Sequence, residues 1–120
     1  MKRALVAIGL ALAAPAALAH AFLDHAEPRV GSKVDASPAR VTLWFTQALE
    51  PAFSRVQVLD AKGQEVDRKD GAVDSKDSTM MHASLPPLAP GKYRVQWRVL
   101  SADTHVTKGD FSFEVGGGAR

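Results

Sequence analysis

The sequence predicts an all-β domain, a small antiparallel β-sandwich or Greek-key β-barrel of about seven strands. Several short segments alternate apolar and polar side chains, which is the pattern of a strand with one buried face. Gly, Pro and Asp residues separate these segments at intervals of about ten residues, as turns do between short strands. No segment of useful length repeats its apolar residues with the helical period of about 3.6.

The first stretch of the chain is expected to lie outside this domain. Residues 1–3 are Met-Lys-Arg, and residues 4–19 are almost wholly apolar and end in Ala-Leu-Ala. This pattern is typical of a cleavable secretory signal peptide, and the stretch is short and rich in alanine for a membrane span. Cleavage after Ala19 makes His20 the first mature residue. Cleavage after Ala21 satisfies the same rule and removes His20, so the pattern leaves both sites open.

Strands and turns are expected in alternation along the rest of the chain. Lys62 and Gly63 fit a hairpin turn, residues 69–77 a polar loop and residues 100–104 a short connection. The expected strands are residues 22–27, 40–46, 54–60, 64–68, 78–85, 92–99 and 105–115. The folded domain is therefore expected over residues 20–115, with residues 116–120 as a flexible Gly-rich tail.

The alternation also predicts which side chains form the core. One face of each apolar strand is expected to pack inward, because successive side chains point to opposite sides of a sheet. The predicted core residues are Val41, Leu43, Phe45, Tyr93, Val95, Trp97, Val99, Phe111, Phe113 and Val115.

Composition excludes several kinds of protein. The chain has 15 Lys and Arg against 13 Asp and Glu, and the loss of two basic residues with the signal leaves a formally neutral domain. No basic run indicates a nucleic-acid surface. The chain has no cysteine, so an exported domain must be held by its core rather than by disulfides, and it has no thiolate for a metal. No second apolar stretch is long enough to cross a bilayer.

Three residues form a candidate metal site. As the first mature residue, His20 would offer both its α-amine and its imidazole, which together can chelate one metal ion. Asp103 and His105 are two residues apart, so in extended backbone both side chains face the same side. Nitrogen and oxygen donors without sulfur suit Cu(II). The competing interpretation is that an Asp-x-His triplet after a strand is only a turn or a surface pair.

These residues occur in segments that resemble one known family. Residues 93–105 (YRVQWRVLSADTH), followed by Gly109 and an alternating Phe-Ser-Phe-Glu-Val, closely resemble the C-terminal signature of CopC proteins. These are periplasmic copper-binding proteins of bacterial copper resistance and uptake. The resemblance extends over nearly the whole mature chain, through His20, Leu23, Pro28, Gly31, residues 41–46 (VTLWFT) and residues 86–93.

The resemblance implies a fold, a site and a partner. The family fold is a Greek-key β-barrel of immunoglobulin-like appearance. Its Cu(II) ion is bound by the amine and imidazole of the first mature residue and by the Asp and His of the Asp-x-His motif, here His20, Asp103 and His105. The resemblance therefore favours cleavage after Ala19 over cleavage after Ala21, because only the first leaves His20 at the mature N-terminus. The family partner resembles CopD, an inner-membrane protein.

Two features depart from the family pattern. Some members bind Cu(I) in a Met-rich loop that also has a His, whereas the matching residues 59–76 contain neither residue type, so that site is expected to be absent. Met80, Met81 and His82 form the one Met cluster, and in a strand Met is more often core filler than ligand. Gln47 stands where some relatives have a Glu near copper, a change that tunes affinity.

The expected protein is a periplasmic Cu(II)-binding protein, with one ion per chain, that stores, buffers or delivers copper. It is expected to be a monomer, without enzymatic activity and without a nucleic-acid partner. His25 is expected at the surface or beside the site. Two alternatives remain open: a copper-dependent oxidative enzyme with a terminal-His brace, or a metal-free immunoglobulin-like interaction module in which Asp103 and His105 cap a turn.

Overall fold

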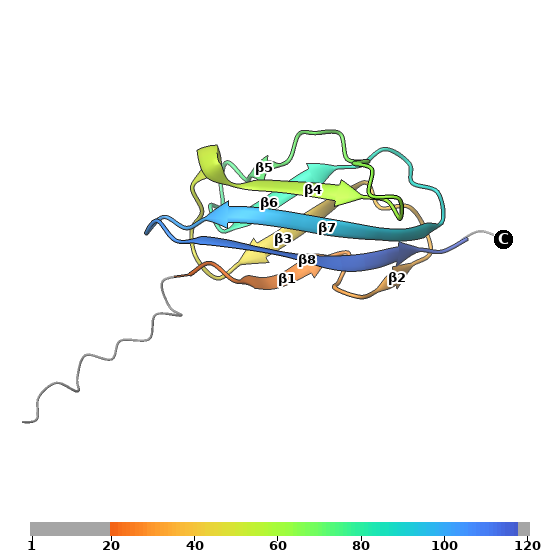
Figure 1. Cartoon of the computed structure of the whole chain (residues 1–120), viewed down its shortest axis with the longest axis horizontal. Helices are drawn as coiled ribbons and strands as arrows, with labels where there is room; N and C mark the ends of the chain where they lie inside the picture. Colours follow the sequence, from red (N-terminus) through yellow and green to blue (C-terminus); the bar gives the residue numbers. More distant parts are fainter. Residues whose placement is uncertain (1–19, 118–120) are drawn as a thin grey trace, which may run out of the picture.

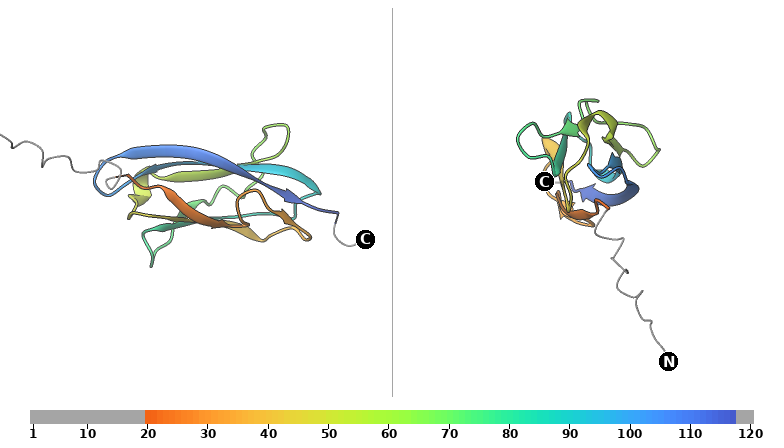
Figure 2. Two further views of the ribbon diagram at one scale, coloured as in Figure 1. Left: turned by 90° about the horizontal axis from the view of Figure 1, so that it is seen from below. Right: turned by 90° about the vertical axis from the view of Figure 1, so that its left-hand side faces the viewer.

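The computed structural model describes residues 20–117, which form a two-layer β-sandwich (Figure 1, Figure 2). The predicted signal peptide and most of the predicted tail lie outside these residues, so both stay predictions. No helix within the described range is long and apolar enough to cross a membrane. The eight strands of this range are β1 (Leu23–Glu27), β2 (Lys33–Val34), β3 (Arg40–Phe45), β4 (Arg55–Leu59), β5 (Ala72–Val73), β6 (Met80–Ser84), β7 (Gly91–Leu100) and β8 (Val106–Val115).

The strands divide into two sheets of four. One sheet has the order β1-β3-β6-β5 and the other the order β2-β8-β7-β4, so the chain crosses between the sheets after each of β1, β2, β3, β4 and β6. All strand pairs are antiparallel except β2 with β8, which run parallel. The predicted all-β class is thus confirmed in its sandwich form. The parallel pair and the two-residue strands β2 and β5 were not expected, because two residues are too few to show alternation.

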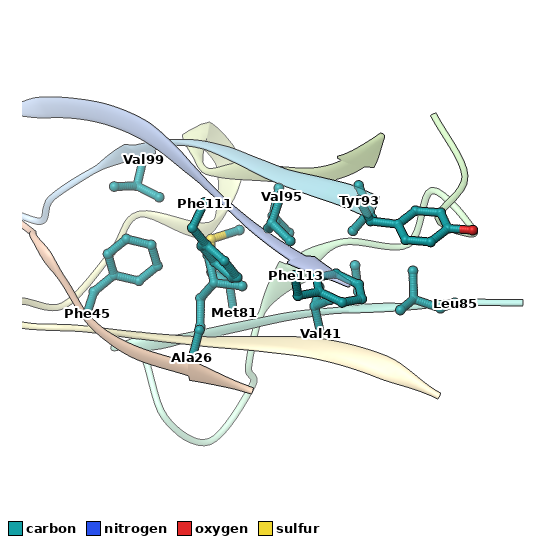
Figure 3. Close-up of a cluster of buried hydrophobic side chains, with 14 of the residues drawn as sticks. Ala26, Val41, Phe45, Met81, Leu85, Tyr93, Val95, Val99, Phe111 and Phe113 are labelled. Carbon is teal, nitrogen blue, oxygen red and sulfur yellow. The ribbon is translucent and has the colours of Figure 1, made fainter. Parts of the chain in front are cut away.

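The core lies between the two sheets, where the alternating faces meet (Figure 3). The predicted core residues are buried apart from Trp97, which is partly buried and packs edge-on against Phe45 with ring centroids 5.9 Å apart. Met81 is fully buried in the same core, as its position in a strand indicated. Burial of these apolar side chains is the main favourable term holding a chain without disulfides.

Residues 64–68 differ from the prediction, because they do not form a regular strand. A single bridge joins Leu59 to Glu65, and the Val66 amide donates to the Val58 carbonyl at 2.8 Å. Beyond this point the buried Asp67 carboxylate accepts a hydrogen bond from the Val58 amide at 2.8 Å. A side chain therefore replaces the strand-to-strand hydrogen bond, and the ladder ends there.

Candidate metal centre

The three predicted ligands meet at one end of the sandwich. His20 lies just before β1, and Asp103 and His105 lie in the loop that joins β7 to β8, which reaches the same end (Figure 1). The imidazole rings of His20 and His105 have centroids 4.7 Å apart and planes inclined by 32°. Asp103 Oδ1 is 3.4 Å from His105 Nδ1. Two imidazoles and one carboxylate, from opposite ends of the chain, thus lie together at the surface.

Two threonines hold the segment that carries His20. The Phe22 amide donates to Thr46 Oγ1 at 3.0 Å, and the Thr46 amide donates back to the Phe22 carbonyl at 2.9 Å. From the other sheet, the Thr107 hydroxyl donates to the Ala21 carbonyl at 2.6 Å. Ala21 itself is fully buried. His20 is therefore anchored to both sheets at the point where β3 ends and β8 begins.

Ser101 shapes the loop that carries Asp103 and His105. Its amide donates to the His105 carbonyl at 2.9 Å, and its hydroxyl oxygen accepts from the His105 amide at 3.1 Å. Between them, Thr104 has a φ of 73°, a left-handed conformation that is rare for a β-branched residue. Such a conformation persists only where the surrounding contacts impose it. The hydrogen bonds of Ser101 close the loop around it.

The same serine stabilises the Asp103 carboxylate. The Ser101 hydroxyl donates to Asp103 Oδ1 and holds the pKa of that carboxyl below its ordinary value, with His105 acting in the same direction. Asp103 is therefore an anion at neutral pH, ready to accept a cation. The side chains of His105 and Asp103 are 47% and 48% exposed, so a small ion or a partner molecule can reach them directly.

The described residues do not hold a ready-made metal cage. Within residues 20–117, no group of three or more His, Cys, Asp or Glu side chains is arranged to surround a metal ion. In the full chain the His20 nitrogen is also part of the peptide bond to Ala19, so the α-amine does not exist before cleavage. The geometry brings the His20 ring next to the His105 ring and the His105 ring next to the Asp103 carboxylate.

The remaining histidines and methionines lie elsewhere. A bulge between Leu23 and His25 turns the His25 ring onto Trp44, where the two rings stack with centroids 4.3 Å apart. Its Nδ1 is 2.7 Å from Asp24 Oδ2. His82 lies on the outer face of the sheet, with Nε2 3.1 Å from Asp74 Oδ1, and Met80 shares that face.

The anchoring residues were not found by sequence reasoning. Thr46 and Thr107 each follow or begin a strand, as many threonines do, and their partners are 24 and 86 residues away in the chain. A short-range pattern cannot detect such pairs. Ser101 lies within the recognised signature, but its role depends on the loop conformation. Gln47 follows Thr46 and is half-buried.

Replacing Ser101 with Ala should raise the pKa of Asp103 toward the ordinary value for Asp, because the carboxylate loses its main donor. A depressed pKa stabilises the folded state above the unfolded-state value of about 3.9, and this contribution is lost as the pH falls through the folded-state pKa. The variant should therefore show a weaker fall in stability in acid. Carboxyl-carbon NMR titration measures the pKa directly.

Asp74 is the internal control for that titration. Its pKa is also lowered, by the Lys76 amide and then by His82, and neither contact involves Ser101. Its titration should be the same in both proteins. An unchanged pKa for Asp103 in the Ser101→Ala variant would contradict the role given to the serine.

Known proteins resemble the chain over nearly its whole described length. Residues 23–116 match the model of the CopC domain. The chain is 32% identical over 116 residues to protein YobA of Escherichia coli strain K12, covering 96% of this chain and 94% of YobA. It is 34% identical over 116 residues to copper resistance protein C of Xanthomonas campestris pv. juglandis, covering 92% and 91%.

A solved structure agrees with these relationships. The crystal structure of CopC from Methylosinus trichosporium OB3b superimposes with a TM-score of 0.76 and 36% sequence identity, covering 81% of this chain and 94% of that one. The domain match, the sequence relatives and the shared β-sandwich fold together show that the chain belongs to the CopC family.

Proposed function

We propose that this protein is a periplasmic copper-binding protein that holds one Cu(II) ion, as cargo, between His20, Asp103 and His105. The observation that carries the proposal is the 4.7 Å approach of the His20 and His105 rings beside the Asp103 carboxylate. Membership of the CopC family and the similarity to a copper resistance protein support copper as the ion.

The donor set suits Cu(II). After cleavage, the His20 amine and imidazole supply two nitrogens, His105 a third, and Asp103 an anionic oxygen. Nitrogen and oxygen donors in a tetragonal arrangement favour Cu(II), whereas thioethers and thiolates favour Cu(I). The amine and the imidazoles must lose their protons to bind, so affinity should fall as the solution is acidified.

The packing of Ala21 supports cleavage after Ala19. Ala21 is buried and its carbonyl accepts the hydrogen bond from Thr107. Cleavage after Ala21 would remove this buried residue together with His20, whereas cleavage after Ala19 keeps both. A secretory signal that ends at Ala19 would also direct the domain across the inner membrane, which is the basis for proposing a periplasmic location.

The exposed site favours storage and delivery over catalysis. An acceptor can reach the ion by ligand exchange without opening the fold, because Asp103 and His105 are half exposed. Delivery to a CopD-like inner-membrane protein, by a monomeric carrier, fits this geometry. An oxidative enzyme would instead need an open position beside the His20 brace, and in the proposed site Asp103, 3.4 Å from His105 Nδ1, would take one position as a ligand. We therefore propose a carrier.

Cu(II) affinity should depend on the free amine of His20. Adding one Gly before His20 should lower the Cu(II) affinity by at least about 100-fold, because the His20 amine becomes an amide. Mutating a residue that only hydrogen-bonds to a metal ligand typically lowers metal affinity by about 10- to 100-fold, and loss of a ligand itself should lower it more. His105→Ala should also weaken binding. Competition with a chelator measures each affinity, and intact mass confirms that the tested chain begins at His20.

The matched controls are a Gly added after Arg120 and the His82→Ala variant, which should bind Cu(II) like the wild type. Equal affinities for the extended, His105→Ala and wild-type chains would place copper at another site. If no form binds Cu(II), the metal-free interaction module is the better description.

Cu(I) should bind much more weakly than Cu(II). Residues 59–76 contain no Met or His, Met81 is buried in the core, and Met80 is the one Met of the described residues with an exposed part. Competition with chelators specific for each oxidation state tests this preference. Tight Cu(I) binding that is lost in Met80→Leu would show that the outer face of β6 holds a second site.

A further inference from the structure

Three cations form one row across the outer face of the sheet β2-β8-β7-β4. Arg55 of β4 is paired with Arg98 of β7, and Arg98 is paired with Lys108 of β8. All three side chains are exposed and point away from the core, since their neighbours Val56 and Val99 are buried. Side chains paired in this way have Cβ atoms about 5 Å apart, and like charges at that distance repel one another.

This repulsion is only partly compensated. Every ion pair among residues 20–117 involves a histidine, so none of the three cations is directly paired with a carboxylate. Two acidic groups lie nearby: Asp110 is on the same face of β8, and Glu65 is close enough for Arg55 to act on its titration. A chain that carries nearly balanced charge overall thus concentrates positive charge on one surface.

The three cations also line part of a hollow on this face. The three cations, two glutamines and Asp110 line a depression of about 480 Å³ on this face. Gln96 and Asp110 are paired in the next row along the strands, and Gln57 faces Gln96 from β4. A depression of this size admits acidic side chains, and the guanidinium groups of Arg55 and Arg98 can each bind a carboxylate with two parallel hydrogen bonds.

Exposed apolar side chains lie at the adjoining end of the sandwich. Phe22, Phe53 and Val106 are 46%, 61% and 47% exposed. Phe22 is two residues after His20, Val106 directly follows His105, and the segment of Phe53 is joined to β7 by the bond from the Glu50 amide to the Leu100 carbonyl. Aromatic and apolar residues beside arginines are the composition of protein interfaces.

We infer that this face and end together form a docking surface for an acidic segment of a partner protein. The row lies three residues from Ser101 along β7, which is roughly 10 Å at the usual rise of a strand. A flat bilayer that contacts the apolar end would not reach the cations on the side of the sandwich. The surface of a partner protein can contact both the apolar end and the face that carries the cations. The inference deepens the proposed delivery of copper, because a partner bound here also reaches His20 and His105.

The test uses metal-free mature protein and a capped peptide of alternating Glu and Ser. The peptide should shift the amide NMR signals around Arg55, Arg98 and Lys108. Reversing the row (R55E, R98E and K108E) should weaken peptide binding by at least about tenfold, since charge complementarity is inverted. The control variant reverses three exposed cations away from the row (R29E, R40E and K62E) and should bind within about threefold of wild type.

Several results would overturn the inference. These are equal loss of binding in both triple variants, peptide-induced shifts on another face, or binding of phosphatidylglycerol vesicles through the row without binding of the peptide. If the charge-reversed protein fails to fold, the neutral variant R98Q with K108Q should show the same loss. Cu(II) affinity measured on the row variants should stay at the wild-type value, which separates a failure of this surface from a failure of the copper site.

Discussion

The arrangement of this end of the molecule depends on two threonine hydroxyls that hold residues 20–22 against both sheets. Thr46 bonds to the Phe22 amide from the first sheet, and Thr107 bonds to the Ala21 carbonyl from the second. Ala21 packs into the core between them. Without these contacts residues 20–22 would be a free chain end, and bringing His20 next to His105 would cost the conformational entropy of ordering this segment. With them, the two imidazoles are already adjacent.

Because His20 is anchored in this way, removal of the predicted signal peptide and formation of the proposed copper site depend on the same residue. The fold places the His20 side chain, and in the proposed copper site the α-amine that would complete the chelate forms only if the chain is cut before that residue. The opposite donors come from a loop whose backbone is closed by Ser101, which also lowers the pKa of Asp103. The proposed copper site is half exposed, which suits release of the ion to an acceptor, and the cations Arg55, Arg98 and Lys108 lie on the face where the proposed partner would bind.

Much of this architecture could be predicted from the sequence, because it follows from alternation. The faces of β3, β7 and β8 were identified from side-chain order, and Met81 falls in the core for the same reason. The features that could not be predicted depend on single side-chain contacts. Asp67 ends the ladder after Glu65, and a bulge rotates His25 onto Trp44. The proximity of His20 and His105 was expected from family resemblance, since no pattern relates residues so distant in the chain.

Pulsed electron paramagnetic resonance of the Cu(II)-loaded mature protein tests the central claim most directly, because it counts the imidazoles bound to copper. We expect two coordinated imidazoles in the wild-type protein and one in the His105→Ala variant, with no change in His25→Ala or His82→Ala. A spectrum that still shows two imidazoles in His105→Ala, and loses one in either of the other variants, would contradict the assignment of His20 and His105 as the copper ligands.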